Sequence, residues 1–76
     1  MRVEEAIESI ASSETITGIT AAMVMRDRKN LKAFVNMIHD QYYRDGNSEN
    51  MIDIYGKEEI ETIINYGVEN NLIIKK

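Results

Sequence analysis

Cysteine, proline and tryptophan are absent from this chain of 76 residues, and glycine occurs only four times. Without cysteine, neither a disulfide nor a thiolate metal site can stabilise the fold. Without proline, and with so little glycine, no segment has the composition of a linker between domains. The sequence therefore predicts a single small domain over residues 1–76.

Long hydrophobic runs are absent as well. The longest apolar stretches cover residues 21–25 and 72–74, far short of the roughly 20 residues that span a bilayer. The N-terminus opens with glutamates and has no signal-peptide pattern. We therefore expect no membrane contact and a location in the cytoplasm, or in the cytoplasm of a host cell. The small size and the Ile- and Asn-rich composition also fit a phage- or plasmid-type protein.

Positive charge is scarce, because nine Lys and Arg residues face thirteen Asp and Glu residues. The resulting net charge of -4 argues against a general nucleic-acid coat protein. One segment departs from this acidic background, and we name its four cations the basic island: Arg26, Arg28, Lys29 and Lys32.

Apolar residues make up 43% of the chain and recur at helical spacing in four segments, 2–12, 16–25, 30–44 and 57–70. A break near Asp27 is expected, because one rod over 16–44 would be about 43 Å long. Alternating isoleucines predict a short strand at 51–55, and 72–75 predicts a second. The fold class is thus an all-α bundle of about four helices, with two very short strands.

The periodicity also assigns the inward residues of each helix. Gly67 lies among them in mid-helix, which indicates a close approach of another segment to the backbone. Asn70 and Asn71 can supply a left-handed cap. In the third helix, Asn36 and His39 are placed on the outward side. The expected inward residues of the last three helices are Ile16, Ile19, Ala22 and Met23; Leu31, Phe34, Val35, Ile38 and Tyr42; and Ile60, Ile63, Ile64, Gly67 and Val68.

Catalytic chemistry has little support. The one histidine, His39, precedes Asp40, and neighbours on a helix point about 100° apart, so the carboxylate cannot readily orient the ring. No phosphate loop, nucleophile elbow or zinc motif occurs. The sequence predicts a protein that is not an enzyme, with no catalytic residues, metal or cofactor.

A calcium loop is a second possibility to weigh. Residues 45–53 place oxygen-bearing side chains at the alternate positions of an EF-hand. However, Asn50 stands where that loop needs glycine, and Gly56 stands where it needs a bidentate glutamate. We expect an ordinary polar loop.

Nucleic-acid binding is the alternative function. The basic island precedes a helix and could contact phosphates. The stretch 58–76 resembles the recognition-helix end of winged-helix domains, a resemblance that implies a small winged-helix or helix-turn-helix regulator. Against it, the helix concerned begins Lys57-Glu58-Glu59 and contains no arginine.

Protein binding is the preferred function. Methionine is adaptable at interfaces, and tyrosine is favoured there. Tyr42 and Tyr43 are adjacent, so one of them should be exposed. We predict a non-enzymatic regulatory, inhibitory or adaptor protein with a protein partner, and self-association would help so small a core. The expected contact residues are Met25, Met37, Tyr42 and Tyr43.

Overall fold

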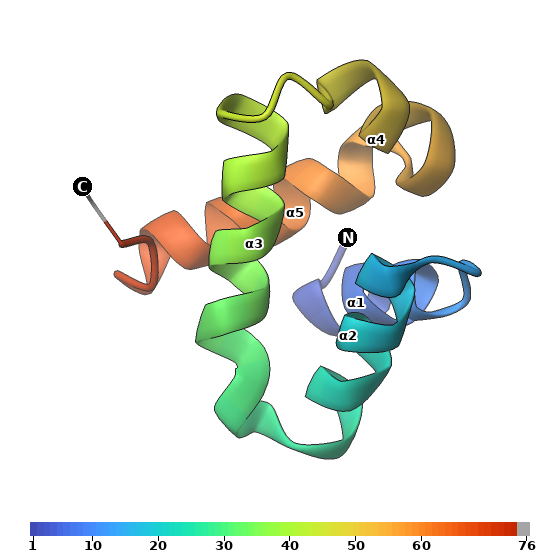
Figure 1. Ribbon diagram of the computed structural model, residues 1–76. Helices are drawn as coiled ribbons and strands as arrows, with labels where there is room; N and C mark the ends of the chain where they lie inside the picture. The colour runs from blue at the N-terminus through green and yellow to red at the C-terminus, as the bar shows by residue number, and fades with distance from the viewer. Residues whose placement is uncertain (75–76) are drawn as a thin grey trace.

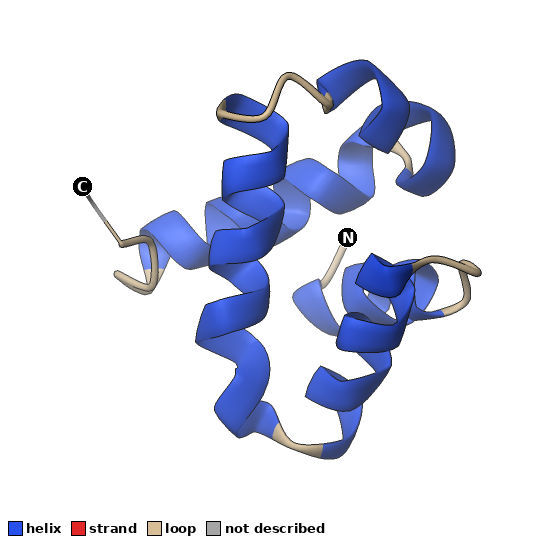
Figure 2. Cartoon of the chain, in the orientation of Figure 1, coloured by secondary structure: helices blue, strands red, loops and turns tan. Residues whose placement is uncertain are grey.

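A computed structural model describes residues 1–74, which form five α-helices and one 3₁₀ turn, with no strand in this range (Figures 1 and 2). The all-α prediction is confirmed, with one helix more than expected. In chain order the elements are α1 (Val3–Ala11), α2 (Ile16–Arg26), η1 (Arg28–Asn30), α3 (Leu31–Tyr43), α4 (Ser48–Tyr55) and α5 (Lys57–Glu69).

The additional helix is α4, and it replaces the strand expected at 51–55. Met51 and Tyr55 are buried one turn apart, whereas Ile54 is exposed, so the burial follows a helical period. Because α4 begins at Ser48, most of the calcium-type loop is helical, and the calcium geometry does not form.

Two layers of helices enclose the core. Helix α1 packs against both α2 and α5, and α3 crosses α5 (Figure 1). The largest fully buried side chains come from α1, α2, α3 and α5: Ile7, Ile10, Val24, Phe34, Val35, Ile38, Ile60 and Ile63. No helix within residues 1–74 combines the length and the apolar character that crossing a membrane requires.

Helix α2 packs with a different face from the one expected. Its buried residues are Thr17, Gly18, Ala21 and Val24. A Cβ at Gly18 would overlap the Ser13 carbonyl and the Ile10 carbonyl, so small residues on this face let α1 come close. The prediction that Ile16, Ile19 and Met23 point inward is wrong, and Ala22 is only half-buried.

The break between α2 and α3 falls at Asp27, as predicted. Asp27 leaves the helical conformation, with φ -144° and ψ 107°. Its carboxylate then accepts a hydrogen bond from the Lys29 amide at 3.0 Å, which caps η1. The chain therefore turns over the four residues 27–30 and enters α3 at Leu31.

The segment after α5 is extended and is held by a side chain rather than by a strand. Asn71 takes a left-handed φ of 56°, as predicted, and ends the helix. Asn36 is buried, contrary to expectation: its amide donates to the Leu72 carbonyl at 2.8 Å and accepts from the Ile74 amide at 2.7 Å. The strand predicted at 72–75 is absent over 72–74, and residue 75 lies outside the described residues.

Most inward residues of α3 and α5 are as predicted. Phe34, Val35 and Ile38 are buried, as are Ile60, Ile63, Ile64 and Gly67. Leu31 and Tyr42 are half-buried against the core. Val68 is the exception: it is 60% exposed and lies beside the groove between α3 and the end of α5.

Candidate functional site

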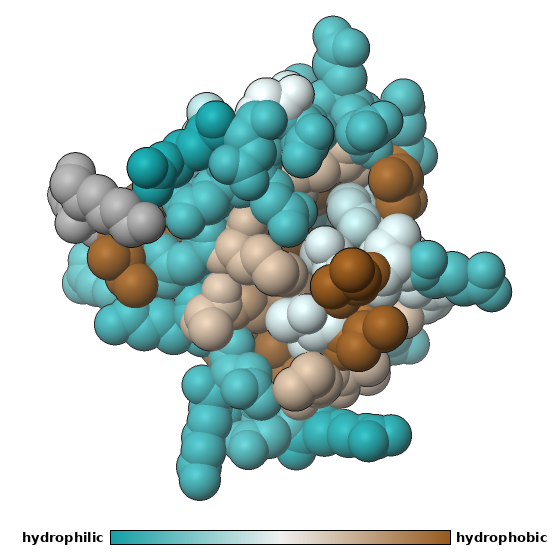
Figure 3. All heavy atoms as spheres, viewed as in Figure 1, coloured by the Kyte–Doolittle hydropathy of each residue, from teal (hydrophilic) through white to brown (hydrophobic). Residues whose placement is uncertain are grey.

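Three large, exposed apolar side chains lie together on α2. Ile16, Ile19 and Met23 are 83%, 64% and 51% exposed. Their spacing of three and four residues places them on one side of the helix, opposite the side packed on α1. We call these three residues the outer face of α2. Figure 3 shows hydrophobic side chains gathered over this part of the molecule.

One feature of the sequence that points to this face is the lack of charge along α2. No charged residue occurs between Glu14 and Arg26, so both sides of α2 are apolar or weakly polar. A surface helix normally has one charged side. Its absence means that the period cannot indicate which side is buried, and the small residues decide it by packing.

The N-terminus of α2 is fixed in place by hydroxyl groups. The Thr15 hydroxyl accepts a hydrogen bond from the Gly18 amide at 2.9 Å, a typical N-cap. The same hydroxyl bonds the Tyr55 hydroxyl at 2.9 Å and the Ser13 hydroxyl at 3.0 Å. The outer face of α2 therefore belongs to a helix whose start is hydrogen-bonded to α4 and to the loop that follows α1.

Opposite charges flank the outer face of α2. Glu14 precedes the helix, and Arg26 is its last residue; both are exposed. Neither forms an ion pair with any group in residues 1–74. The face thus has a negative end and a positive end, and neither charge is compensated by an ion pair within residues 1–74.

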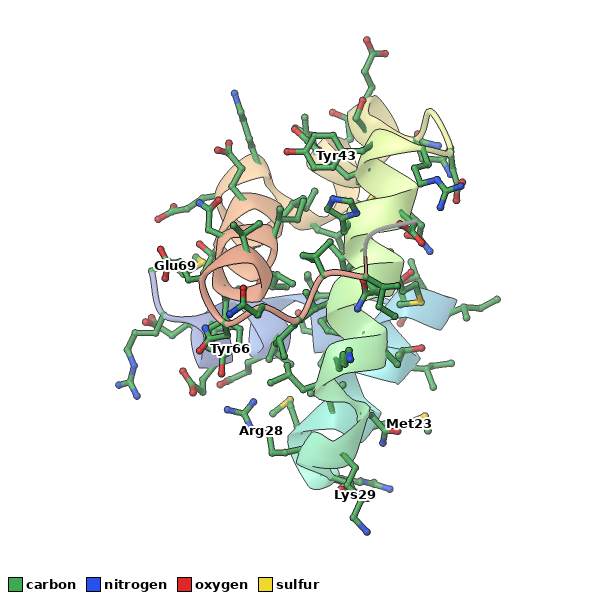
Figure 4. The ribbon with its side chains drawn as sticks, turned by 90° about the vertical axis from the view of Figure 1, so that its left-hand side faces the viewer. Met23, Arg28, Lys29, Tyr43, Tyr66 and Glu69 are labelled. Atoms are coloured by element: carbon green, nitrogen blue, oxygen red, sulfur yellow. The ribbon has the colours of Figure 1, made fainter. Side chains whose placement is uncertain are left out.

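The basic island lies at the junction of α2, η1 and α3, and its four residues are exposed. The Arg28 guanidinium donates to the Glu4 carboxylate at 3.1 Å. In Figure 4, Arg28 and Met23 lie on opposite sides of this end of the molecule, with Lys29 at its tip. Part of the island's charge is therefore used within the chain.

Glu4 belongs to the first turn of α1 and has a perturbed pKa. A hydrogen bond from its own backbone amide, together with the guanidinium groups of Arg2 and Arg28, lowers the pKa of Glu4 from its ordinary value. The carboxylate form is favoured because the amides of a first helical turn and nearby cations both stabilise negative charge.

The four predicted contact residues do not form one surface. Met25 is exposed, but it lies beside Ile7 and Arg28 over α1. Met37 and Tyr42 are half-buried against the core. Tyr43 is 62% exposed, as expected for one of the two tyrosines, and Figure 4 places it at the opposite end of the molecule from Met23.

His39 lies in a shallow groove between α3 and the end of α5. The groove has a volume of about 800 Å³, and Asp40, Arg44, Val68 and Ile74 also line it. His39 Nδ1 and Asp40 Oδ1 are 3.4 Å apart, a long contact that orients the ring weakly. The His39 ring also packs against the Tyr43 ring, with centroids 5.1 Å apart. Within residues 1–74 no three acidic or histidine side chains are placed to hold a metal ion.

The fold and this site together define a small all-α protein with an exposed apolar helix face. Comparison with protein-family models, with curated proteins and with solved structures finds no match to the chain. Any functional conclusion must therefore rest on the residues themselves.

Proposed function

We propose that this chain is a non-enzymatic regulatory, inhibitory or adaptor protein that works by protein–protein contact through the outer face of α2. The observation that carries the proposal is the exposure of Ile16, Ile19 and Met23 on one side of one helix. Single exposed apolar residues are ordinary, whereas a grouped set of large ones is typical of an interaction site.

The chemistry of the face suits a helix-mediated contact. Anchors at positions i, i+3 and i+7 are the pattern by which a helix docks its apolar side on a partner. Isoleucine is stiff at χ1 and loses little side-chain entropy on contact, while methionine adapts to an irregular partner surface. The capped and tied N-terminus of α2 reduces the ordering cost of binding further.

The contact residues expected from the sequence have a smaller part in this proposal. Met25 and Tyr43 are exposed and could extend a large interface, but they lie away from the outer face of α2. Met37 and Tyr42 pack against the core, so their substitution would report on stability before it reported on binding.

Nucleic-acid binding remains the second proposal, because all four basic-island residues are exposed. Charge reversal at Arg28 and Lys29 separates the two functions. It should abolish binding to duplex DNA at low salt if phosphates are the ligand. It should leave an apolar contact through α2 largely intact. Fluorescence anisotropy of labelled DNA, at low and high salt, measures the first effect.

Site-specific photo-crosslinking tests the main proposal. In one variant, expressed in the native host cell, a photoreactive phenylalanine analogue replaces Ile19. In the matched control variant the same analogue replaces Val68. The two positions are similarly exposed, at 64% and 60%, and the end of α5 lies far from α2 (Figure 1). We expect a discrete protein adduct from position 19 and none from position 68.

Two results would contradict the proposal. One is the absence of any protein adduct from position 19 under conditions where the chain is folded. The other is an identical set of adducts from both positions, which would indicate random collision. Adducts that disappear on nuclease treatment would favour the nucleic-acid proposal.

A further inference from the structure

The outer face of α2 is arranged symmetrically along the helix. The midpoint between Ile16 and Met23 falls between Ile19 and Thr20, and the midpoint between Glu14 and Arg26 is Thr20 itself. The centres of the apolar residues and of the flanking charges therefore lie within half a residue of each other. At ~1.5 Å of rise per residue, Ile16 and Met23 lie about 5 Å on either side of it.

A two-fold axis through this centre would make the face complementary to itself. In an antiparallel pair of α2 helices, Ile16 of one copy meets Met23 of the other, and the two Ile19 side chains meet near the axis. Such an isologous contact uses the same surface on both copies. It would cover the three large apolar side chains that each copy exposes on this face, six in the pair.

The charges select the antiparallel direction. With the helices antiparallel, Glu14 of one copy lies near Arg26 of the other, twice per pair. With the helices parallel, Glu14 would face Glu14 and Arg26 would face Arg26, which is unfavourable. The helix dipoles also favour the antiparallel arrangement, since the positive N-terminus of each α2 lies near the negative C-terminus of the other.

Other charges near the ends of α2 do not oppose this pairing. The Asp27 carboxylate is turned onto the Lys29 amide at 3.0 Å, and Arg28 is paired with Glu4 at 3.1 Å on the side of α1. Glu14 and Arg26 have no ion partner in residues 1–74, so both are available to a second copy.

We propose that the occupant of the outer face of α2 is a second copy of this chain, in an antiparallel two-fold dimer centred between Ile19 and Thr20. This inference rests on the proposed function and names the partner of the same face. The contact is small, since three large side chains on each copy fall below the size of a typical stable interface. The dimer is accordingly weak and exchanges with the monomer.

Sedimentation velocity over about 5 to 500 μM tests the dimer, a range chosen for a weak interface. The wild-type mass should rise from one chain toward two. Ile19→Glu should stay at one chain throughout, because each dimer would bury two carboxylates in its centre. Val68→Glu, an equally exposed apolar position on another helix, should behave as the wild type does.

Charge reversal tests the direction of the helices. Glu14→Arg and Arg26→Glu should each weaken the dimer by about tenfold or more, because each replaces two attractive pairs by two repulsive ones. The double variant should return to within about threefold of the wild type, since the pairs are restored with exchanged signs. In a parallel pair the double variant would keep its like charges opposed and gain nothing.

The outcomes separate this inference from the proposed function. A wild type that stays monomeric at every concentration, or a Val68→Glu variant as impaired as Ile19→Glu, overturns the dimer. If position 19 then still crosslinks to a different protein, the proposed function stands and only the second copy is wrong. If no adduct forms either, both fail. Circular dichroism of each variant checks that its helices are intact, and the charge variants provide the test should Ile19→Glu not fold.

Discussion

Gly67 is the residue at which helix propensity and packing conflict most directly. It lies inside α5, where alanine would be the better helix former by about 1 kcal/mol. A Cβ there would overlap Val35 Cγ1 and come within 2.9 Å of Ile73 Cδ1. Val35 is fully buried and β-branched, so it cannot easily move aside. Glycine thus lets α3 and the segment after α5 pack on one point.

We predict that Gly67→Ala lowers the free energy of unfolding by about 1–2 kcal/mol, because overpacking outweighs the gain in propensity. Urea unfolding followed by circular dichroism measures the change. The control is Asn65→Ala, at an exposed position of the same helix, which should stabilise slightly, by about 0.5 kcal/mol or less. A Gly67→Ala variant as stable as the wild type would contradict the packing argument.

At the same scale, Asn36 shows how one amide can substitute for a strand. The side chain forms hydrogen bonds with Leu72 and Ile74 through the two groups that a neighbouring backbone would offer. It also donates to the Lys32 carbonyl at 2.8 Å, within its own helix. Because all these hydrogen bonds are formed, the Asn36 side chain is buried without leaving an unpaired polar group, which explains why a residue expected to face water lies on the core side.

At the scale of the element, the start of α1 is coupled to the turn after α2. Glu4 accepts from Arg28 at 3.1 Å across this gap, and the pKa of Glu4 is lowered, chiefly by its own backbone amide and then by Arg2 and Arg28. A carboxylate whose pKa is lower in the folded chain stabilises the fold above its unfolded pKa. That contribution is lost as the pH falls through the folded pKa.

We therefore predict that Glu4→Gln is less stable than the wild type at pH 7 and that the difference becomes smaller at about pH 3, because the Glu4 carboxylate takes up protons as the pH falls toward its lowered folded pKa. Because Glu4 is exposed, the effect should be small. Urea unfolding at both pH values measures it. Glu8→Gln, one turn later on α1, is the control for net charge. A difference that persists unchanged in acid, or that Glu8→Gln reproduces, would show that ionisation of Glu4 is not the cause.

Helix α2 is the element in which composition and packing diverge. Its inner side is made of small residues, and its large residues face outward. Burial of Ile16, Ile19 and Met23 would have required α1 to lie farther away, and the close contact at Gly18 would then be lost. The result is a well-packed helix pair that leaves its most hydrophobic side uncovered.

At the scale of the whole molecule, size explains why covering that side matters. A chain of 76 residues buries about 60% of the surface of its unfolded form, and its stability is correspondingly small. The proposed dimer, which would form only from folded chains, would add to this stability roughly in proportion to the logarithm of the protein concentration. Association and folding should therefore be linked in this protein.

We predict that the wild-type melting temperature rises by several degrees between about 5 μM and 500 μM, since about 1 kcal/mol corresponds to roughly 4–8 °C for a domain of this size. Ile19→Glu should melt at one temperature throughout this range, and Val68→Glu should follow the wild type. Scanning calorimetry or circular dichroism provides the measurement. Equal concentration dependence in all three proteins would show that the outer face of α2 is not the linked surface.

The sequence alone was enough for the class of fold and for much of the core. The periods of α1, α3 and α5, the break at Asp27 and the left-handed Asn71 all follow from local patterns, because each depends on residues within one or two turns. The absence of an apolar run of about 20 residues, the length needed to span a bilayer, was likewise evident from the sequence.

Tertiary structure alone decided which side of α2 is buried, that residues 51–55 continue a helix, and where Asn36 points. Each of these depends on tertiary contacts: α1 packs against Gly18, Tyr55 bonds Thr15 forty residues away, and Leu72 bonds Asn36 thirty-six residues away. Where both sides of a helix are apolar, the spacing of apolar residues does not predict which side is buried, because packing volume and hydrogen-bond partners then determine burial. The large residues of α2 form an exposed face because its small residues are the ones that pack against α1.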